Sequence, residues 1–304
     1  MSTNGKRPRY EEDSDETEAS TPSSNGSVRQ PQSNSQGLPS RLEPTIFGIF
    51  PTSDFTKQVG DFLYQNIDRE YVEIEAKLGR LIDTRTRERI QLDVACETIV
   101  SPQRRNLKFE SNMTEAQHKH FNEILNNRVV ATKPPYQGVP LEYKHIFETD
   151  RVYQRNNCKV RVTTNTKTGQ IVNGGIVEKV RIAVLNVHSP NTYLDYRITV
   201  NSEKPVEMPT GQHVHERNKD RLSYTHQLFK VDLTQVKGPE KSRNVDGTMP
   251  PQDLSHELEV EFINPQILIE EKNKLTQQQH NRYVNIVENF LNNIRCLAKE
   301  AQIP

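Results

Sequence analysis

The stretch HELEVEF, residues 256–262, alternates three glutamates with three apolar side chains. In an extended strand, successive side chains point to opposite faces and the chain rises about 3.3 Å per residue. Glu257, Glu259 and Glu261 therefore share one face of a predicted strand, spaced about 6.6 Å apart. Such a row of like charges repels itself unless cations lie against it. The stretch thus predicts a strand whose acidic face needs cationic neighbours.

The chain as a whole has no net charge, so its local arrangements of charge matter more than its total. The 304 residues carry 40 Lys and Arg against 40 Asp and Glu, and 33% of them are hydrophobic. This length supports one large domain or two ordinary ones. Zero net charge argues against bulk attraction of polyanions, so any anion must be bound by local charges. Three widely spaced cysteines without a CxxC pair are typical of a reduced intracellular protein.

Two parts of the chain differ in composition. Residues 1–43 are polar with a single aromatic residue, Tyr10, and predict a disordered tail. The motif KRPR, residues 6–9, fits either a nuclear-import patch or a solvated charge cluster. Residues 44–304 form the predicted folded domain. Because the chain has neither an apolar run of membrane-spanning length nor a signal-peptide core, we expect a soluble protein of cytosol or nucleus.

Period-two alternation dominates the folded part and predicts strands rich in β-branched and aromatic residues. The predicted strands are residues 71–78, 89–100, 143–154, 159–165, 175–187, 193–203, 217–227, 228–236 and 256–262. Helical spacing predicts helices over residues 53–67, 114–130 and 276–300, the last two beginning with the capping boxes Thr114/Gln117 and Thr276/Gln279. Eight or nine strands without interspersed helices favour an antiparallel barrel or sandwich, classed as mainly β (α+β), over a βαβ fold.

Charged and apolar side chains separate when each strand is sorted by parity. Basic residues fill one face at 217–221, whereas acidic residues fill one face at 257–261. A sandwich with solvated outer faces also shows such alternation, but solvated faces usually mix the two signs. The segregation therefore favours a closed barrel whose charged faces line a lumen. The other residues predicted on the polar faces are Glu73, Glu75, Lys77, Arg161, Lys179, Arg181, Asp195, Arg197, Glu203, Lys230, Asp232 and Thr234.

A lumen of this composition points to phosphate chemistry. Buried charge is tolerated only when it is paired or bound to metal. Carboxylates beside Arg and Lys clusters therefore indicate a divalent cation together with a chain of phosphates. Oxygen ligands suit Mg²⁺ or Mn²⁺ better than zinc. Hydrolysis of a terminal phosphate is the reaction that such a set supports.

Some histidines and apolar residues are expected to have structural roles. His118 and His120 lie two apart on a predicted helix and are expected to be solvated. The loop motif HVHE, residues 213–216, lacks further ligands at zinc-site spacing. The stripe of Val284, Val287, Leu291 and Ile294 predicts packing on the outer wall of the barrel, with a dimer contact as the alternative.

Four ordered motifs carry a resemblance to a known family. EIEAK, residues 73–77, has the ExExK pattern of the triphosphate tunnel metalloenzymes. RNKDR at 217–221, KVDLT at 230–234 and ELEVE at 257–261 follow in order. Over about residues 45–304 the chain thus resembles the fungal RNA 5′-triphosphatases, the beta subunits of mRNA-capping enzymes. The resemblance implies an eight-stranded tunnel, a nuclear location, and release of the γ-phosphate from nascent pre-mRNA as the first step of cap formation.

The resemblance also implies roles for individual residues. The implied metal ligands are Glu73, Glu75 and Glu261. The implied phosphate-binding residues are Arg161, Lys179, Arg217, Lys219, Arg221, Lys230 and Thr234. Glu257 and Glu259 are implied as supporting carboxylates, Asp232 as a support of the phosphate site, and Glu203 as the residue that positions the attacking water. Lys230 stands where the family commonly has arginine, and a lysine offers a point charge rather than a bidentate grip.

The expected partners and the alternatives follow from the same resemblance. The expected substrate is 5′-triphosphate RNA, the expected cofactor is Mg²⁺ or Mn²⁺, and a homodimer is implied. Budding-yeast relatives dock the guanylyltransferase through a Trp-containing peptide, but this chain has no tryptophan. Guanylyltransferase and the RNA polymerase II apparatus therefore both stay open as partners. The alternative functions are a tunnel-fold tripolyphosphatase or thiamine triphosphatase, and a non-catalytic module that binds phosphorylated ligands.

Overall fold

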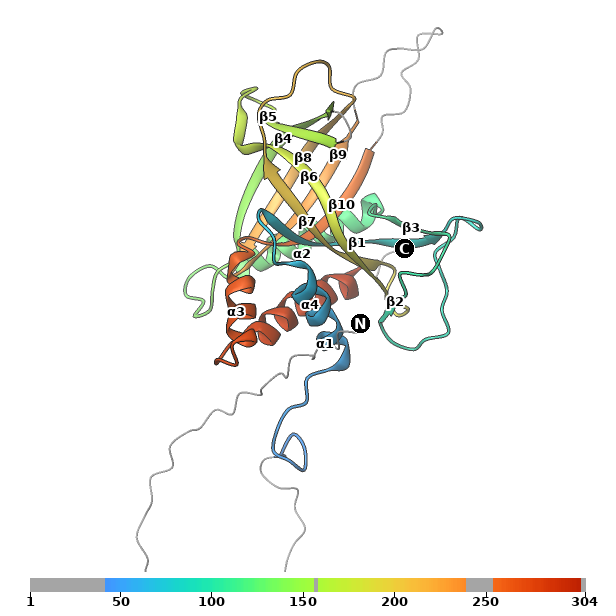
Figure 1. Ribbon diagram of the computed structural model, residues 1–304, viewed down its shortest axis with the longest axis vertical. Coiled ribbons are helices and arrows are strands. Elements are labelled where there is room, and N and C mark those ends of the chain that lie inside the picture. The colour runs from blue at the N-terminus through green and yellow to red at the C-terminus, as the bar shows by residue number, and fades with distance from the viewer. Residues whose placement is uncertain (1–41, 156–157, 239–253, 302–304) are drawn as a thin grey trace, which may run out of the picture. The chain divides into compact units, whose positions relative to one another are not determined.

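Eight of the alternating strands close into an antiparallel barrel (Figure 1). The computed structural model describes residues 42–155, 158–238 and 254–301. The barrel strands are β1 Val72–Asp83, β4 Glu142–Arg155, β5 Cys158–Asn165, β6 Ile171–His188, β7 Asp195–Pro205, β8 His215–His226, β9 Phe229–Lys237 and β10 Leu254–Phe262. They follow the order β10-β9-β8-β4-β5-β6-β7-β1, and pairing of β1 with β10 closes the ring. The predicted closed barrel is confirmed.

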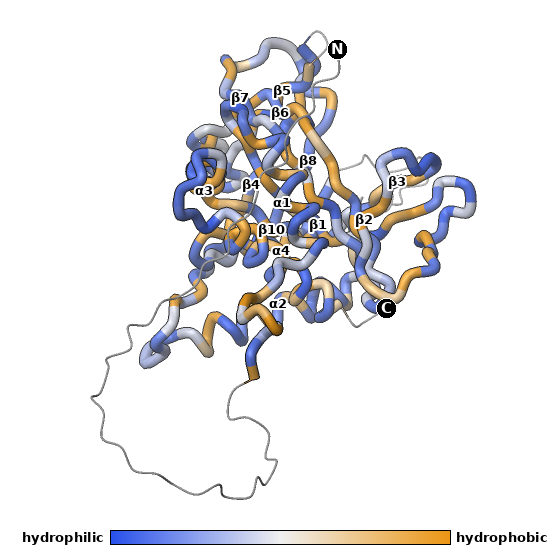
Figure 2. The backbone as a smooth tube through the Cα atoms, turned by 60° about the horizontal axis from the view of Figure 1, so that its bottom comes forward, coloured by the Kyte–Doolittle hydropathy of each residue, from blue (hydrophilic) through white to orange (hydrophobic). Residues whose placement is uncertain are grey.

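Parity decides which side chains face outward, as the sequence predicts. On β1 the outward residues Ile74 and Leu78 are buried under neighbouring elements, and on β10 Leu258 and Val260 are equally buried. The tube in Figure 2 alternates hydrophobic and hydrophilic residues along these strands. Because the apolar residues face the surrounding helices, the charged residues between them must face the interior.

The strand predicted over residues 89–100 is largely wrong. Only β2, Thr98–Val100, is a strand there, paired with β6, and β3, Leu107–Glu110, adds to the edge of β1 without having been predicted. Ile90 instead packs in a small cluster with Leu81 and Val100. The alternation in this segment therefore serves a local core beside the barrel, not a ladder of the barrel.

Asp195, predicted on the charged face, lies outside the lumen and is fully buried. Its carboxylate accepts hydrogen bonds from the backbone N–H of Leu81 at 2.8 Å and of Ser189 at 3.0 Å. The Arg89 guanidinium donates to both carboxylate oxygens, at 2.6 and 3.0 Å. Asp195 thereby fixes the segment after β1 onto the start of β7.

Four helices accompany the barrel within the described residues: α1 Asp54–Asn66, α2 Glu115–Ala131, α3 Gln266–Thr276 and α4 Tyr283–Glu300. The predicted capping box of α2 is present, since Thr114 accepts from Gln117 N and the Gln117 side chain accepts from Thr114 N. The predicted start at Thr276 is wrong, because Thr276 ends α3, which the sequence reasoning missed. Gln278 has a left-handed φ of 57°, which separates the two helices. None of the helices among the described residues is long and apolar enough to span a membrane.

Helix α4 packs on the outer wall of the barrel as predicted. The centroid of the Phe290 ring lies 5.7 Å from that of Phe229 on β9 and 4.9 Å from that of Phe262 on β10. Val287 and Leu291 of the predicted stripe are fully buried beside it. Helix α1 in turn packs on α4, where Tyr283 Oη donates to Gly60 O at 2.8 Å. These contacts hold the outward faces of β9 and β10 in place.

The prediction for His118 is wrong, since the ring is half-buried between α2 and β10. Its centroid lies 4.7 Å from that of His256. Burial, with a smaller contribution from His256, lowers the pKa of His118 to about 4, so the ring is neutral at pH 7.

Residues up to Asp54 form a unit separate from Phe55–Pro304. Within its described part, Thr45 Oγ1 donates to Ile49 O at 2.8 Å and closes a turn. The predicted tail lies almost wholly outside the described residues.

Phe290→Ala should lower the free energy of unfolding by about 3–5 kcal/mol, because it leaves a cavity between two barrel strands and α4. Urea unfolding measures this change. Asn289→Ala, at an exposed position on the same turn of helix, is the matched control and should change stability by less than about 0.5 kcal/mol. Equal losses in the two variants would contradict this packing.

Candidate active site

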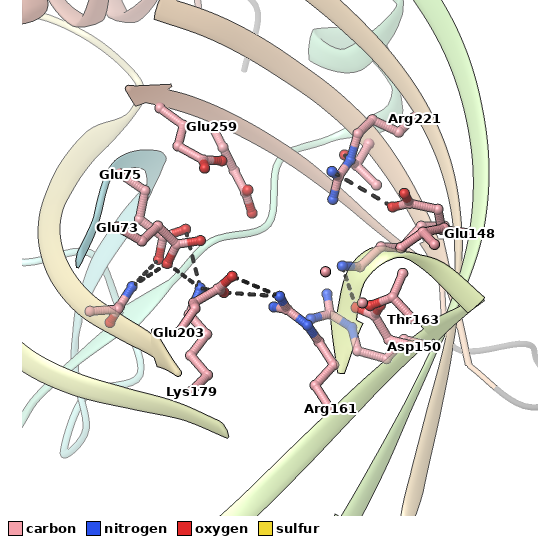
Figure 3. A pocket seen from close by; sticks show the side chains of 18 of the residues that line it. Glu73, Glu75, Glu148, Asp150, Arg161, Thr163, Lys179, Glu203, Arg221 and Glu259 are labelled. Carbon is pink, nitrogen blue, oxygen red and sulfur yellow. Dashed lines mark hydrogen bonds and ion pairs between the residues drawn. The ribbon is translucent and has the colours of Figure 1, made fainter. Parts of the chain in front are cut away.

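The barrel encloses a polar lumen of about 450 Å³, lined by inward residues from all eight strands (Figure 3). Thirteen of the predicted site residues line it: Glu73, Glu75, Arg161, Lys179, Glu203, Arg217, Lys219, Arg221, Lys230, Thr234, Glu257, Glu259 and Glu261. Asp232 lies just behind the lining and is only 1% exposed. The sequence therefore identified most of the side chains that meet in this space.

The acidic row of β10 is balanced by cations from three other strands. Arg217 Nη2 donates to Glu257 Oε1 at 2.6 Å. Lys77 of β1 pairs with Glu259, and Lys230 Nζ of β9 lies 3.1 Å from Glu261 Oε2. Each glutamate therefore has its own cationic partner, on the neighbouring strands β1 and β9 for Glu259 and Glu261 and on β8 for Glu257.

Lys77 illustrates how strongly these charges interact. Burial by itself would lower the pKa of Lys77, but the carboxylates of Glu259, Glu75 and Glu257 outweigh it and raise that pKa above its usual value. The pKa of Glu259 is held low because Lys77 and Arg221 outweigh burial, which alone would raise it. Both groups are therefore charged at neutral pH.

A second cluster joins β1, β6 and β7. Lys179 Nζ lies 2.5 Å from Glu73 Oε2, 3.1 Å from Glu203 Oε1 and 3.8 Å from Glu75 Oε2. Asn201 Nδ2 donates to Glu73 Oε2 at 2.8 Å and to Glu75 Oε1 at 3.1 Å. The two glutamates of the first motif thus point into the lumen from one wall, as Figure 3 shows.

Arg161 faces this cluster from β5. Its Nη2 donates to both oxygens of Glu203, at 2.9 and 3.0 Å. Its buried Nε has no hydrogen-bond partner among the described residues, so that N–H is available to an anion in the lumen. Arg161 and Lys179 together lower the pKa of Glu203, outweighing burial, which by itself would raise it. The Glu203 carboxylate is therefore ionised and fixed between two cations.

Sequence reasoning missed two carboxylates of β4. Asp150 pairs with Lys219 and accepts from Thr163 Oγ1 at 2.7 Å, and Glu148 Oε2 lies 3.8 Å from Arg221 Nη1. Parity within residues 143–154 puts both acidic side chains on one face with Val152, so the strand itself carried the signal. Asn201 gave no such signal, because an isolated asparagine on a strand is common on solvated faces as well.

Carboxylates gather near Glu261 in a way that fits a metal ion. Asp232, Glu259 and Glu261 each offer an oxygen, and these atoms lie within 4.8 Å of one another. Glu75 is the register partner of Glu261 across the β1–β10 seam. Burial raises the pKa of Glu261 to about 8, and Glu73 and Asp232 add to this effect against the opposing charge of Lys230.

Such an excess of buried carboxylate is relieved by a divalent cation, and an all-oxygen donor set suits Mg²⁺ or Mn²⁺. The residues present therefore fit an oxygen-ligated metal. The carboxylates that lie together are Asp232, Glu259 and Glu261. Of the predicted metal ligands Glu73, Glu75 and Glu261, only Glu261 belongs to this group. Glu73 and Glu75 lie instead against Lys179 and Asn201.

Comparison with known proteins gives consistent matches. The sequence model of the family described as "mRNA capping enzyme, beta chain" matches residues 49–303. The mRNA-capping enzyme subunit beta of Schizosaccharomyces pombe is 37% identical over 258 residues, which cover 81% of each chain. That of Cryptococcus neoformans var. neoformans is 35% identical, covering 85% of this chain and 64% of its own.

Solved structures match as well. The S. pombe Pct1 RNA triphosphatase is 35% identical with a TM-score of 0.77, covering 87% of this chain and 99% of that one. The same triphosphatase in complex with the Spt5 CTD matches with a TM-score of 0.76, 35% identity, and coverage of 86% and 99%.

Glu261→Gln should weaken Mn²⁺ binding by at least about tenfold, because it removes a charged oxygen ligand. Loss of a residue that only supports a metal ligand already lowers metal affinity by about tenfold or more. Calorimetric titration of the folded protein measures the affinity. Glu216→Gln is the matched control, since Glu216 pairs with Arg151 at 2.8 Å on the outer face of the barrel. Unchanged Mn²⁺ affinity in Glu261→Gln would contradict the metal site.

Proposed function

This chain belongs to the family of mRNA-capping enzyme beta chains, and we propose that it removes the γ-phosphate from 5′-triphosphate RNA, leaving a diphosphate end for cap formation. It is a hydrolase of a phosphoric anhydride bond. The observation that supports this reaction most strongly is the enclosed lumen, in which cations of β5, β6 and β8 face carboxylates of β1 and β10. Pure anion binding would have no use for so many carboxylates facing the same space.

The cations of the lumen bind and orient the triphosphate. Arg161 presents a free N–H and a guanidinium that grips phosphate oxygens in a bidentate way, whereas Lys179 and Lys219 act as point charges. Arg217, Arg221, Lys230 and Thr234 surround the same volume. Because the cations are held by carboxylate partners before the substrate arrives, little reorganisation is needed during the reaction.

In this proposal Glu73, Glu75 and Glu261 would hold the divalent cation, which would replace Lys179 as the partner of the first two, and Glu257 and Glu259 are supporting carboxylates. When bound, a divalent cation neutralises charge on phosphate oxygens and helps to orient water for in-line attack. Glu203, ionised between Arg161 and Lys179, positions the attacking water and accepts its hydrogen bond. Asp232 fixes Arg221, whose Nη1 lies 3.2 Å from its Oδ2. Mg²⁺ and Mn²⁺ are the candidate metals.

We extend the proposal to partners and location. The S. pombe relative is solved with the Spt5 CTD, and the relatives are named as subunits of a capping enzyme. We propose that this chain acts in the nucleus, as a homodimer, alongside guanylyltransferase or the RNA polymerase II apparatus. Because the chain has no tryptophan, docking through a Trp-containing peptide is not carried over to it from the budding-yeast relatives.

The proposed reaction predicts metal-dependent release of phosphate from 5′-triphosphate RNA. Release should require Mg²⁺ or Mn²⁺, stop with chelator, exceed release from inorganic tripolyphosphate, and be abolished in Glu73→Ala while the barrel stays folded. Phosphate release and circular dichroism measure the two properties. Full turnover in Glu73→Ala, or in the presence of chelator, would refute the assignment.

Arg161→Lys should lower kcat/KM by about 10²-fold, because a lysine cannot reproduce the bidentate contact with phosphate. Arg151→Lys is the matched control, since Arg151 also pairs with a glutamate but on the outer face of the barrel. Steady-state kinetics on the same RNA measures both variants. Retained activity in Arg161→Lys would indicate attraction by charge alone.

A further inference from the structure

The two ends of the lumen differ in charge. Because neighbouring strands are antiparallel, β1, β4, β6 and β9 run towards one end and the other four run away from it. The lining residues at the first end include Lys77, Arg181 and Arg217 with one carboxylate, Glu257. We call this end the basic mouth.

The opposite end, which we call the acidic mouth, is lined by the first inward residues of β1 and β4 and the last of β7 and β10. Its four carboxylates are Glu73, Glu148, Glu203 and Glu261. Arg221 and Lys230 lie at this level, and the charged ends of Lys179 and Arg161 reach Glu73 and Glu203 from above, so that these carboxylates are paired. The charge of the lining therefore falls along the lumen, from an excess of cations at the basic mouth to paired carboxylates at the acidic mouth.

The cations at the basic mouth are not fully compensated. Arg181 is exposed and makes no ion pair with the described residues. Arg197, the β7 residue paired with Lys77, donates to Asn186 Oδ1 at 2.8 Å and lies 4.7 Å over the ring of Phe109. Burial, with a smaller contribution from Arg181, lowers the pKa of Arg197 to about 10. Two guanidinium groups near each other without a carboxylate favour an anion at this end.

The acidic mouth is also lined by an irregular, bulged segment of β6. Thr164 of β5 pairs with Ile171 of β6, and Val162 pairs with Ile176. Residues 172–175 of β6 therefore lie opposite the single residue Thr163 of β5. These four residues line the lumen, and a Cβ on Gly175 would lie 2.7 Å from Thr163 O and from Val172 Cγ2. The acidic mouth is thus lined by tightly folded backbone as well as by carboxylates.

We propose that RNA enters through the basic mouth, so that the γ-phosphate points towards the acidic mouth and Arg181 contacts the phosphates of the RNA body. The proposal rests on the proposed function and assigns the direction in which its substrate lies. The RNA body carries a negative charge at every nucleotide, and it is therefore attracted by uncompensated cations and repelled by carboxylates. The γ-phosphate, in contrast, needs the carboxylates that hold the metal.

Arg181→Ala tests this direction when it is compared with Lys144→Ala. Lys144 is exposed on the same face of β4 as Asp150, but six residues earlier, beyond the acidic mouth. For a short 5′-triphosphate RNA, Arg181→Ala should raise KM roughly tenfold, as expected for loss of one charge-assisted contact. It should also reduce the slope of log KM against log salt by about 1. Lys144→Ala should change neither quantity.

Inorganic tripolyphosphate distinguishes the RNA body from the triphosphate. Arg181→Ala should raise KM more for RNA than for tripolyphosphate. An equal increase for both substrates would overturn the proposed direction. An increase of KM for RNA in Lys144→Ala but not in Arg181→Ala would overturn it as well. Wild-type protein in the same assay distinguishes failure of the proposed function from failure of the proposed direction. If wild-type protein releases no phosphate from RNA, the proposed function fails; if it does and the KM of Arg181→Ala is unchanged, only the direction fails.

Discussion

The structure depends on one electrostatic constraint, which is that charges removed from bulk water must be compensated by other charges within the lumen. Desolvation of an unpaired carboxylate costs several kcal/mol, and β10 alone turns three of them inward. Arg217, Lys77 and Lys230 compensate them from three different strands. The barrel must close to bring these strands together, so the charge pattern and the topology require each other.

The same compensation prepares the lumen for its substrate. Lys77, Arg161 and Lys179 already lie against carboxylates, so a phosphate chain and a divalent cation can replace such contacts with similar ones. Arg161 shows this in one residue, because Nη2 is held by Glu203 while Nε is left for an anion. The apolar outward faces, covered by residues such as Phe290 of α4, keep the walls in position.

Strand parity was enough to predict the barrel strands, their inward faces and most lumen residues, but not the height of a residue along the barrel. Asp195 has the parity of Glu203, yet it lies beyond the lumen and binds Arg89. Asp232 has the parity of Lys230, yet Arg221 and Ser223 cover it. Alternation also failed at residues 89–100, where Ile90 joins a local core. The contacts of Asp195 and Ile90 depend on loops whose path leaves no periodic trace in the sequence, whereas the burial of Asp232 depends on side chains of the neighbouring strand β8.

The central claim is that the lumen holds a divalent cation and a triphosphate together, and anomalous diffraction tests it most directly. Crystals soaked with Mn²⁺ and a non-hydrolysable nucleoside triphosphate should show the manganese signal inside the barrel, next to Glu261. The phosphates should lie between that signal and Arg161, with the nucleoside on the side of Arg181. A manganese signal only on the outer surface, with no phosphate density in the lumen, would contradict the claim.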